Sequence, residues 1–324
     1  MDINNNFDIE KKLIIVAPVY NEEAVIDVFF ARTKKLNEQI QITGIVIVDD
    51  GSVDQTISRI EKISYLFPVP IRIVRLSRNY GHQNACIAGI KVAIEWANKI
   101  NTEWIGIIDA DLQDDPVHFL NLMAESENYD VVYAVRKSRK EGIVIKFLSA
   151  LFYRIISLTS TFPIPNDAGV FSIMRVQIAH LICASGDNDP YFPGLRASVG
   201  FRQKSVPLDR KQRAEGKSKV RMSGLIMLSL RAAILYSNLI FNFILFSGIV
   251  IFCFSLLVSI ILIILRLTGN IDIPGATTIV IIGILSLGIL MVFLGLIAHM
   301  VNRVKVNTSK QNPWIIMEDK ILNK

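Results

Sequence analysis

Four carboxylates lie close together in residues 106–116, which read GIIDADLQDDP. Asp109 and Asp111 follow an apolar run, and Asp114 and Asp115 come directly before a proline. Hard divalent cations such as Mg²⁺ and Mn²⁺ prefer oxygen ligands, and they usually take one or two carboxylates together with phosphates of a substrate. The cluster therefore predicts either a cation site at the end of a strand or a solvated acidic loop.

The two pairs of carboxylates are expected to have different purposes. Asp111 and Gln113 are two residues apart and can point into a cleft together, so they are the expected metal ligands. Proline, as at position 116, is favoured in the first turn of a helix, and aspartate is favoured just before that turn. Asp114 and Asp115 are therefore expected to cap the helix that Pro116 begins.

The elements that must position these residues are visible in the N-terminal part of the chain, where apolar, branched runs alternate with segments of helical periodicity. Strands are expected at 13–20, 44–52, 71–79 and 103–111, with helices at 24–40, 54–67 and 82–99 between them. Such alternation indicates a parallel, doubly wound α/β sheet that is covered on both faces. Ligands bind these sheets at the carboxyl ends of the strands, where the acidic segment is expected.

Polar side chains follow all four expected strands and should meet at one rim: Pro18, Tyr20, Asn21 and Glu22, then Asp49 and Asp50, then Ser77, Arg78 and Asn79, then Asp109 and Asp111. Asp50 is a candidate to accept hydrogen bonds from a nucleobase or ribose, although an acidic turn explains it equally well. Asp54 is expected to cap the helix that follows it. The phosphate-binding loops GxGxxG and GxxxxGK[ST] do not occur in the sequence.

Six motifs occur in the order in which family 2 glycosyltransferases carry them: PVYNEE, VDDGSVDQT, SRNYGHQNACIAG, DADLQDDP, VRKSR and RAEGKSK. The chain resembles that family over residues 11–222, and within it the polyprenyl-phosphate glycosyltransferases, which include dolichol-phosphate mannose synthase and bactoprenol glucosyltransferases. The resemblance implies a GT-A fold, a Rossmann-like α/β domain with a mostly parallel sheet. It also implies a nucleotide-sugar donor, a Mg²⁺ or Mn²⁺ cofactor and inverting transfer to a lipid phosphate.

The resemblance also assigns roles to the residues of the matching motifs. Donor-binding roles fall on Pro18, Tyr20, Glu22, Asp50, Asp109, Arg210 and Ser218, catalytic roles on Asp109, Asp111, Arg136, Arg213 and Lys219, and metal binding on Asp111 and Gln113. Arg136 is expected near the phosphates of the donor. The last basic residues belong to a loop, 202–221, that contains eight cations and suits a lipid phosphate or a leaving diphosphate. Positive charge flanking a membrane span is the alternative explanation for part of this loop.

One stretch departs from the family pattern. Relatives often carry an acidic residue and an arginine in a GDFRL stretch, where this chain has Val170 and Ser172. The roles of those two side chains are therefore not transferred, and Asp167 and Arg175 are candidates to replace them. A phosphate monoester has a second pKa of about 6, so the expected acceptor is mostly ionised at neutral pH without a strong general base.

Two long apolar runs follow the basic loop, at about 238–265 and 276–300, and neither contains an acidic residue, a lysine or an arginine. A helix needs roughly 20 apolar residues to cross a bilayer, so the runs predict a transmembrane hairpin, with two buried core helices as the alternative. Flanking basic residues predict that both chain ends are cytoplasmic, at a bacterial inner membrane. Segments 136–160 and 220–235 have the pattern of amphipathic interfacial helices or of ordinary core-facing helices.

The expected organisation has four parts: a nucleotide-sugar-binding core at 1–160, an acceptor-side region with the basic loop at 161–234, the hairpin at 235–302 and a cytoplasmic tail at 303–324. Glycines at 283, 288 and 295 favour packing between protomers, so a homo-oligomer such as a tetramer is expected. The net charge of +6 suits anionic lipid or phosphate ligands, and no nucleic-acid partner is expected. The scattered cysteines are expected to be buried thiols, and no metal-ligand spacing relates the histidines, which are expected to be structural: His82, His118, His180 and His299.

The function expected from these features is transfer of one sugar to polyprenyl (undecaprenyl) phosphate, for modification of cell-surface glycans such as O-antigen. Glucose from UDP-glucose is the favoured donor. A processive polysaccharide synthase is an alternative, but such enzymes carry a QxxRW motif and this chain has no Arg-Trp pair. A catalytically inactive membrane-anchored scaffold is a second alternative, against which the intact acidic motif argues. A small transport protein fits least, because the apolar runs lack charged residues.

Overall fold

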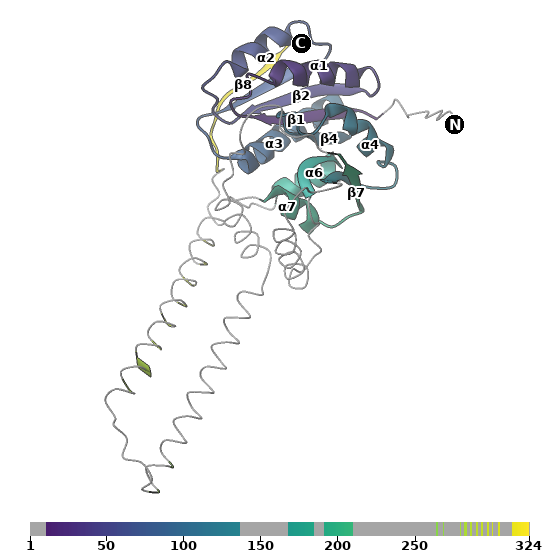
Figure 1. The fold of residues 1–324 in the computed structure, drawn as a ribbon. Coiled ribbons are helices and arrows are strands. Elements are labelled where there is room, and N and C mark those ends of the chain that lie inside the picture. The colour runs from purple at the N-terminus through teal and green to yellow at the C-terminus, as the bar shows by residue number, and fades with distance from the viewer. Residues whose placement is uncertain are drawn as a thin grey trace. The chain divides into compact units, whose positions relative to one another are not determined.

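A computed structural model describes residues 11–136, 168–184, 191–209 and 313–323 of the 324-residue chain, with isolated positions between 264 and 304 (Figure 1). The chain divides into two compact units, of which the first comprises residues 1–158, 162–229 and 311–324. The two predicted membrane spans belong to the second unit and lie, apart from isolated positions, outside the described residues. Within the described residues, no helix is long and apolar enough to cross a membrane.

The first unit is built on an eight-stranded mixed sheet with the order β7-β5-β6-β4-β1-β2-β3-β8. Its strands are β1 (Leu13–Val19), β2 (Ile42–Asp49), β3 (Ile71–Leu76), β4 (Trp104–Ile107), β5 (Val131–Arg136), β6 (Ala168–Arg175), β7 (Gln203–Leu208) and β8 (Ile316–Leu322). Strands β4, β1, β2 and β3 are mutually parallel neighbours, which confirms the predicted mostly parallel α/β sheet. Strand β6 is antiparallel to both β4 and β5, and β8 is antiparallel to β3.

Helices cover both faces of this sheet. Helices α1 (Ile26–Asn37), α2 (Thr56–Ser64) and α4 (Phe119–Ala124), the last preceded by the short 3₁₀ helix η1 (Pro116–His118), pack on one face, while α3 (His82–Ile100), α6 (Val176–Ala184) and α7 (Phe192–Ser198) pack on the other. Alternate residues of β1 accordingly enter different cores: Leu13 and Ile15 join the α1 side, whereas Ile14 and Val16 join the α3 side. Burial on both faces is why this strand reads as a continuous apolar run.

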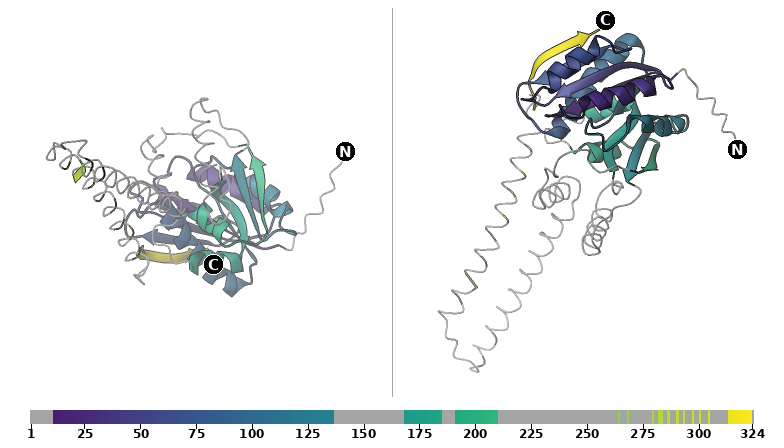
Figure 2. Two further views of the ribbon diagram at one scale, coloured as in Figure 1. Left: turned by 90° about the horizontal axis from the view of Figure 1, so that it is seen from below. Right: turned by 45° about the horizontal axis from the view of Figure 1, so that its top comes forward.

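The end of the chain returns to the sheet as β8, which lies along its edge beside β3 (Figure 2). Arg72 on β3 donates two hydrogen bonds to Asp319, of 2.7 and 2.6 Å, and Lys320 lies 2.6 Å from a carboxylate oxygen of Glu61. Trp314, just before the strand, is buried against the α3 side of the core. These residues were predicted to form a cytoplasmic tail, and the strand β8 was not predicted.

Candidate functional site

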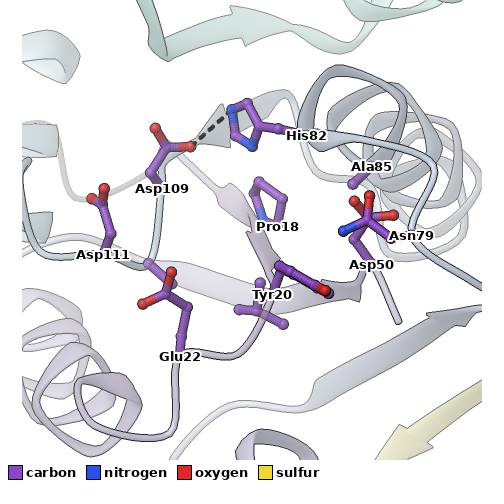
Figure 3. Close-up of a pocket in the computed structure, with 11 residues that line it drawn as sticks. Pro18, Tyr20, Glu22, Asp50, Asn79, His82, Ala85, Asp109 and Asp111 are labelled. Carbon is purple, nitrogen blue, oxygen red and sulfur yellow. Dashed lines mark ion pairs between the residues drawn. The ribbon is translucent and has the colours of Figure 1, made fainter. Parts of the chain in front are cut away.

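A pocket of about 230 Å³ opens at the carboxyl ends of β1, β2 and β4, next to the first turn of α3 (Figure 3). It is lined by Pro18, Val19, Tyr20, Glu22, Asp50, Asn79, His82, Ala85, Asp109, Ala110 and Asp111. Residues that the sequence placed after four separate strands are therefore brought together at one rim. The structure thus shows that these residues lie together at one pocket, and their individual roles remain predictions.

The loops after β1 and β2 hold each other in place. Asn21 has a φ of 53°, in the left-handed region that asparagine tolerates better than most residues. Its backbone N–H donates to Ser52 Oγ at 3.0 Å, and its side-chain oxygen accepts from the N–H of Val53 at 2.9 Å. The N–H of Glu22 donates to Thr56 Oγ1 at 2.9 Å. These cross-links between the loops fix Glu22 at the pocket.

Asp54 supports the same pair of loops. Its carboxylate accepts hydrogen bonds from the N–H and hydroxyl of Thr56, at 3.0 and 2.6 Å, and from the N–H of Glu23 at 3.2 Å. Partial burial acts to raise the pKa of Asp54, but these hydrogen bonds outweigh it and the pKa is lowered. The predicted cap is displaced by one residue: the N-cap of α2 is Gln55, which makes no side-chain capping bond, and Asp54, just before it, binds the N–H of Thr56, the first residue of the helix.

Asp50 connects the end of β2 to the start of α3. Its two oxygens accept from the N–H groups of Tyr80 at 2.7 Å and Gly81 at 3.0 Å. Gly81 has a φ of 93°, which an L side chain rarely adopts. Burial raises the pKa of Asp50, although the two backbone hydrogen bonds act against it. A carboxylate has about four acceptor positions, so Asp50 can fix this loop and still accept from a ligand.

The turn that carries the predicted metal ligands is formed by Leu112, a non-glycine residue with a φ of 60°. This conformation is rare for a bulky side chain and folds Gln113 back onto Asp111. The backbone N–H of Gln113 donates to Asp111 Oδ1 at 3.1 Å, and its side-chain amide donates to Oδ2 at 2.8 Å. Joint binding of a cation therefore requires the amide to turn over and present its oxygen.

The donor chemistry of this turn fits a hard divalent cation that shares its ligands with a substrate. Asp111 faces the pocket and supplies carboxylate oxygens, as Mg²⁺ and Mn²⁺ prefer. Among the described residues there is no group of three or more His, Cys, Asp or Glu that could hold a metal by itself. Mg²⁺ often binds through one or two carboxylates plus substrate phosphates, and the turn matches that mode.

Of the second carboxylate pair, Asp114 and Asp115, the predicted role as a helix cap is confirmed for Asp115. It is the N-cap of η1, where its side chain accepts from the N–H of Val117. It also lies 2.7 Å from the guanidinium of Arg32 on α1. Asp114 is buried, with 2% of its surface exposed. Neither residue lines the pocket, so the acidic cluster divides into a pocket pair and a structural pair.

His82 was interpreted as structural from the sequence, but it lines the pocket. Its Nε2 lies 3.3 Å from Asp109 Oδ1 (Figure 3). The same nitrogen lies 3.7 Å from the sulfur of Cys86. Cys86, then the carboxylates of Asp109 and Asp111, raise the pKa of His82 to about 10. Burial raises the pKa of the Cys86 thiol. The missed signal was the place of His82 directly after the third strand's polar end, because the histidines were searched only for metal-ligand spacing.

Val170 and Ser172, which replace side chains of the family's GDFRL stretch, are buried in the core of the described domain. Val170 is 5% exposed and Ser172 is fully buried, with its hydroxyl donating to the Val170 carbonyl at 2.8 Å. The proposed replacement by Arg175 is wrong, because Arg175 pairs with Trp104 at the start of β4, at the end of the strand away from the pocket. It lies there 3.5 Å from Asp130. Asp167, the other candidate, lies outside the described residues.

A different arginine covers this part of the sheet. The guanidinium of Arg196, on α7, lies 4.1 Å from the ring centre of Tyr133, the residue paired with Ser172 across β5 and β6. Arg196 is fully buried and donates one hydrogen bond, of 3.1 Å, to the Gly169 carbonyl. Within the described part of the chain, its Nε and Nη2 atoms have no hydrogen-bond partner. Burial lowers the pKa of Arg196 to about 10, which leaves it charged at neutral pH.

The remaining predicted site residues are only partly covered by the structure. Arg136 is the last residue of β5, whose final residues lie beside the start of β6. The start of β6 in turn lies at the pocket end of β4, so the backbone of Arg136 is at the same rim of the sheet. The basic-loop residues lie outside the described residues: Arg210, Arg213, Ser218 and Lys219.

The mixed sheet, with an acidic pocket at the carboxyl ends of its parallel strands, defines a GT-A-like α/β domain of the glycosyltransferase class. A family model described as glycosyl transferase family 2 matches residues 14–182. The "Uncharacterized glycosyltransferase YkcC" of Bacillus subtilis (strain 168) is 33% identical over 94% of this chain and 92% of its own. The chain therefore belongs to glycosyl transferase family 2.

Two further comparisons concern a named activity and a solved structure. The "Undecaprenyl-phosphate 4-deoxy-4-formamido-L-arabinose transferase" of Shewanella sediminis (strain HAW-EB3) is 28% identical over 94% of this chain and 90% of its own. The mannosyltransferase PcManGT from Pyrobaculum calidifontis, solved in complex with GDP-Man and Mn²⁺, matches with a TM-score of 0.44 and 16% identity. That match covers 64% of this chain and 58% of the mannosyltransferase chain.

Proposed function

We propose that this glycosyltransferase moves one sugar from a nucleotide sugar to polyprenyl phosphate, with inversion at the anomeric carbon. The observation that carries the proposal is the pocket at the carboxyl ends of the parallel strands, which Asp50 lines from the end of β2 and Asp109 and Asp111 line from the end of β4. The Shewanella sediminis relative, named as an undecaprenyl-phosphate sugar transferase, supports the lipid acceptor. UDP-glucose is the proposed donor.

The proposed reaction is a direct displacement. A phosphate oxygen of the acceptor bonds to the anomeric carbon of the sugar, and the bond from that carbon to the donor's diphosphate breaks. The nucleoside diphosphate leaves with the electron pair. The acceptor oxygen is already ionised at neutral pH, since a phosphate monoester has a second pKa of about 6. No side chain is therefore required at Val170 or Ser172 to remove a proton, in agreement with their burial in the core.

The residues of this chain supply binding and charge control. Asp111 and Gln113 would hold Mg²⁺ or Mn²⁺, and the bound cation would act as a Lewis acid toward the leaving diphosphate. Asp50 and Tyr20 line the side of the pocket proposed for the nucleoside, and Asp109 lies where the sugar or ribose would be. Strand β7 takes up the first part of the predicted basic loop, at 203–208. The basic residues that follow it in the sequence, at 210–221, are proposed to attract the phosphate of the acceptor.

The two apolar runs in the sequence support a membrane location for the proposed enzyme. They would anchor it as a hairpin in a bacterial inner membrane, with the catalytic unit on the cytoplasmic side, where nucleotide sugars are the donors. Segments 136–160 and 220–235 would lie along the membrane surface. A homo-oligomer assembled through the glycines of the second run is part of the same proposal.

The test is transfer by the full chain, incubated with undecaprenyl phosphate, Mg²⁺ or Mn²⁺ and a panel of radiolabelled nucleotide sugars. One donor should give a labelled lipid that carries a single sugar. Label in no lipid from any donor would refute the proposal, and lipids with long sugar chains would favour a processive synthase instead.

Two aspartate variants sharpen this test, because they change neighbouring members of one acidic cluster. Asp111→Asn should lower transfer at least 100-fold, or raise the metal concentration needed for half-maximal activity by a similar factor, because a ligand carboxylate is lost (about 3 kcal/mol at the transition state). Asp115→Asn is the matched control, since asparagine is also a good N-cap and the residue lies outside the pocket. Equal activity of both variants at ordinary metal concentrations would contradict the assignment of Asp111.

A further inference from the structure

The described lining of the pocket is mostly acidic, whereas a nucleoside diphosphate is an anion. Four carboxylates line it, from Glu22, Asp50, Asp109 and Asp111. Among the described residues that line it, His82 is the one basic side chain. A diphosphate adds further negative charge, and like charges brought together in a partly enclosed site repel strongly. A cation bound at Asp111 would offset part of this charge, and His82 is the basic side chain that the described lining adds.

The position of His82 suits a ligand-binding role better than a structural one. It is the first residue of the 19-residue helix α3, so it carries its charge next to the N–H groups of a long helix N-terminus. The side chain is 45% exposed, which leaves it accessible to a ligand. The preceding loop is fixed by the hydrogen bonds that Tyr80 and Gly81 donate to Asp50. His82 is therefore held at the pocket and not buried as a core histidine.

The contacts of the imidazole ring leave one nitrogen for a ligand. Both contacts of His82, to Asp109 at 3.3 Å and to Cys86 at 3.7 Å, are made by Nε2. Within the described part of the chain, Nδ1 has no such contact. The Asp109 carboxylate, 3.3 Å from Nε2, favours the imidazolium form of the ring, in which both nitrogens carry a proton. Figure 3 shows His82 and Asp111 on either side of Asp109.

We propose that His82 binds the diphosphate of the donor directly, with Nε2 held by Asp109 and the Nδ1–H donating to a phosphate oxygen. This assignment rests on the proposed function and names a further donor-site residue for it. A diphosphate above Asp109 would meet His82 on one side and the cation of Asp111 on the other. The hydrogen bond strengthens as the diphosphate leaves and gains charge, so His82 contributes to both donor binding and the transfer step.

The experiment measures the binding of UDP, GDP and uridine to the full chain by calorimetry, with Mg²⁺ and again with EDTA. His82→Gln keeps a hydrogen-bonding side chain but removes the charge, and His82→Lys keeps a cation. His82→Gln should weaken binding of the preferred diphosphate about tenfold, the effect of losing one hydrogen bond to a charged group. Uridine affinity should not change, and His82→Lys should recover most of the loss. The loss should persist in EDTA, because His82 is proposed to act without the metal.

Several results would overturn the assignment. Unchanged diphosphate affinity in His82→Gln would do so, as would an equal loss of uridine and diphosphate binding in both variants, which would make His82 structural. A loss that disappears in EDTA would show that His82 acts through the metal site. If the unaltered chain binds neither UDP nor GDP, the proposed function fails together with this assignment, whereas the other results leave the proposed function standing.

Discussion

Helix α3 packs against the sheet through Gly89, and we expect Gly89→Ala to destabilise the catalytic domain. A Cβ atom there would lie 2.5 Å from Val16 Cγ1 and 2.5 Å from Val48 Cγ2, where ordinary contacts are 3.4–4 Å. Valine side chains are stiff, so the helix itself must move. Overpacking of this kind costs about 1–3 kcal/mol, while replacing glycine by alanine in a helix gains roughly 1 kcal/mol. Two contacts as short as 2.5 Å place the steric cost in the upper part of that range, at about 2–3 kcal/mol, so we expect a net loss of about 1–2 kcal/mol.

Thermal unfolding of the full chain, followed by circular dichroism, measures this effect. A loss of that size lowers the midpoint by about 2–8 °C in a domain of this class. Because α3 carries His82 into the pocket, KM for the donor should rise in the same variant. Asn98→Ala is the control, since Asn98 is exposed on the same helix and the change should stabilise it by a few tenths of a kcal/mol, roughly. A Gly89→Ala variant as stable as the Asn98→Ala variant would refute the close-packing argument.

Two further predictions concern residues away from the pocket. Asp115→Ala removes the N-cap of η1 and the partner of Arg32, so the free energy of unfolding should fall by about 1–2 kcal/mol. The metal dependence of transfer should stay unchanged, and a changed metal dependence would place Asp115 in the site. Arg196→Met removes a buried charge whose side chain makes one hydrogen bond within the described residues, and replacements of buried charges by apolar groups are often neutral or stabilising by about 1 kcal/mol or more. The unfolding midpoint should therefore stay the same or rise, and a fall of several degrees would show that Arg196 has a stabilising partner.

The parallel half of the sheet was predictable because its signals are local. Strands β1 to β4 are buried on both faces, so each appears in the sequence as an apolar run that ends at polar residues. The helices between them have helical periodicity and end near the predicted positions. The pocket followed from the general rule that ligands bind at the carboxyl ends of parallel strands. None of these inferences required knowledge of a contact between distant residues.

The antiparallel strands were not predictable in the same way. Strand β6 enters between β4 and β5, and β8 joins β3 from the far end of the sequence, so both positions depend on non-local pairing. The sequence of β8, IMEDKIL, has three charged residues in its middle and lacks a strong strand signal. Its charges are explained only by their partners, since Asp319 meets Arg72 and Lys320 meets Glu61.

The motif VDDGSVDQT shows why a match to a family motif does not by itself identify the residues that contact a ligand. Asp50 lines the pocket and also fixes the loop before α3. Asp54 does not line the pocket, yet it accepts hydrogen bonds from Glu23 and from the start of α2, and Ser52 accepts from Asn21. Removing any of the three would displace groups that face the donor, so a loss of activity alone could not distinguish them. Such a residue can be assigned to the ligand only if its substitution weakens ligand binding and leaves the stability of the fold unchanged. For the same reason His82 is tested with both diphosphate and uridine, because a structural defect would weaken the binding of both.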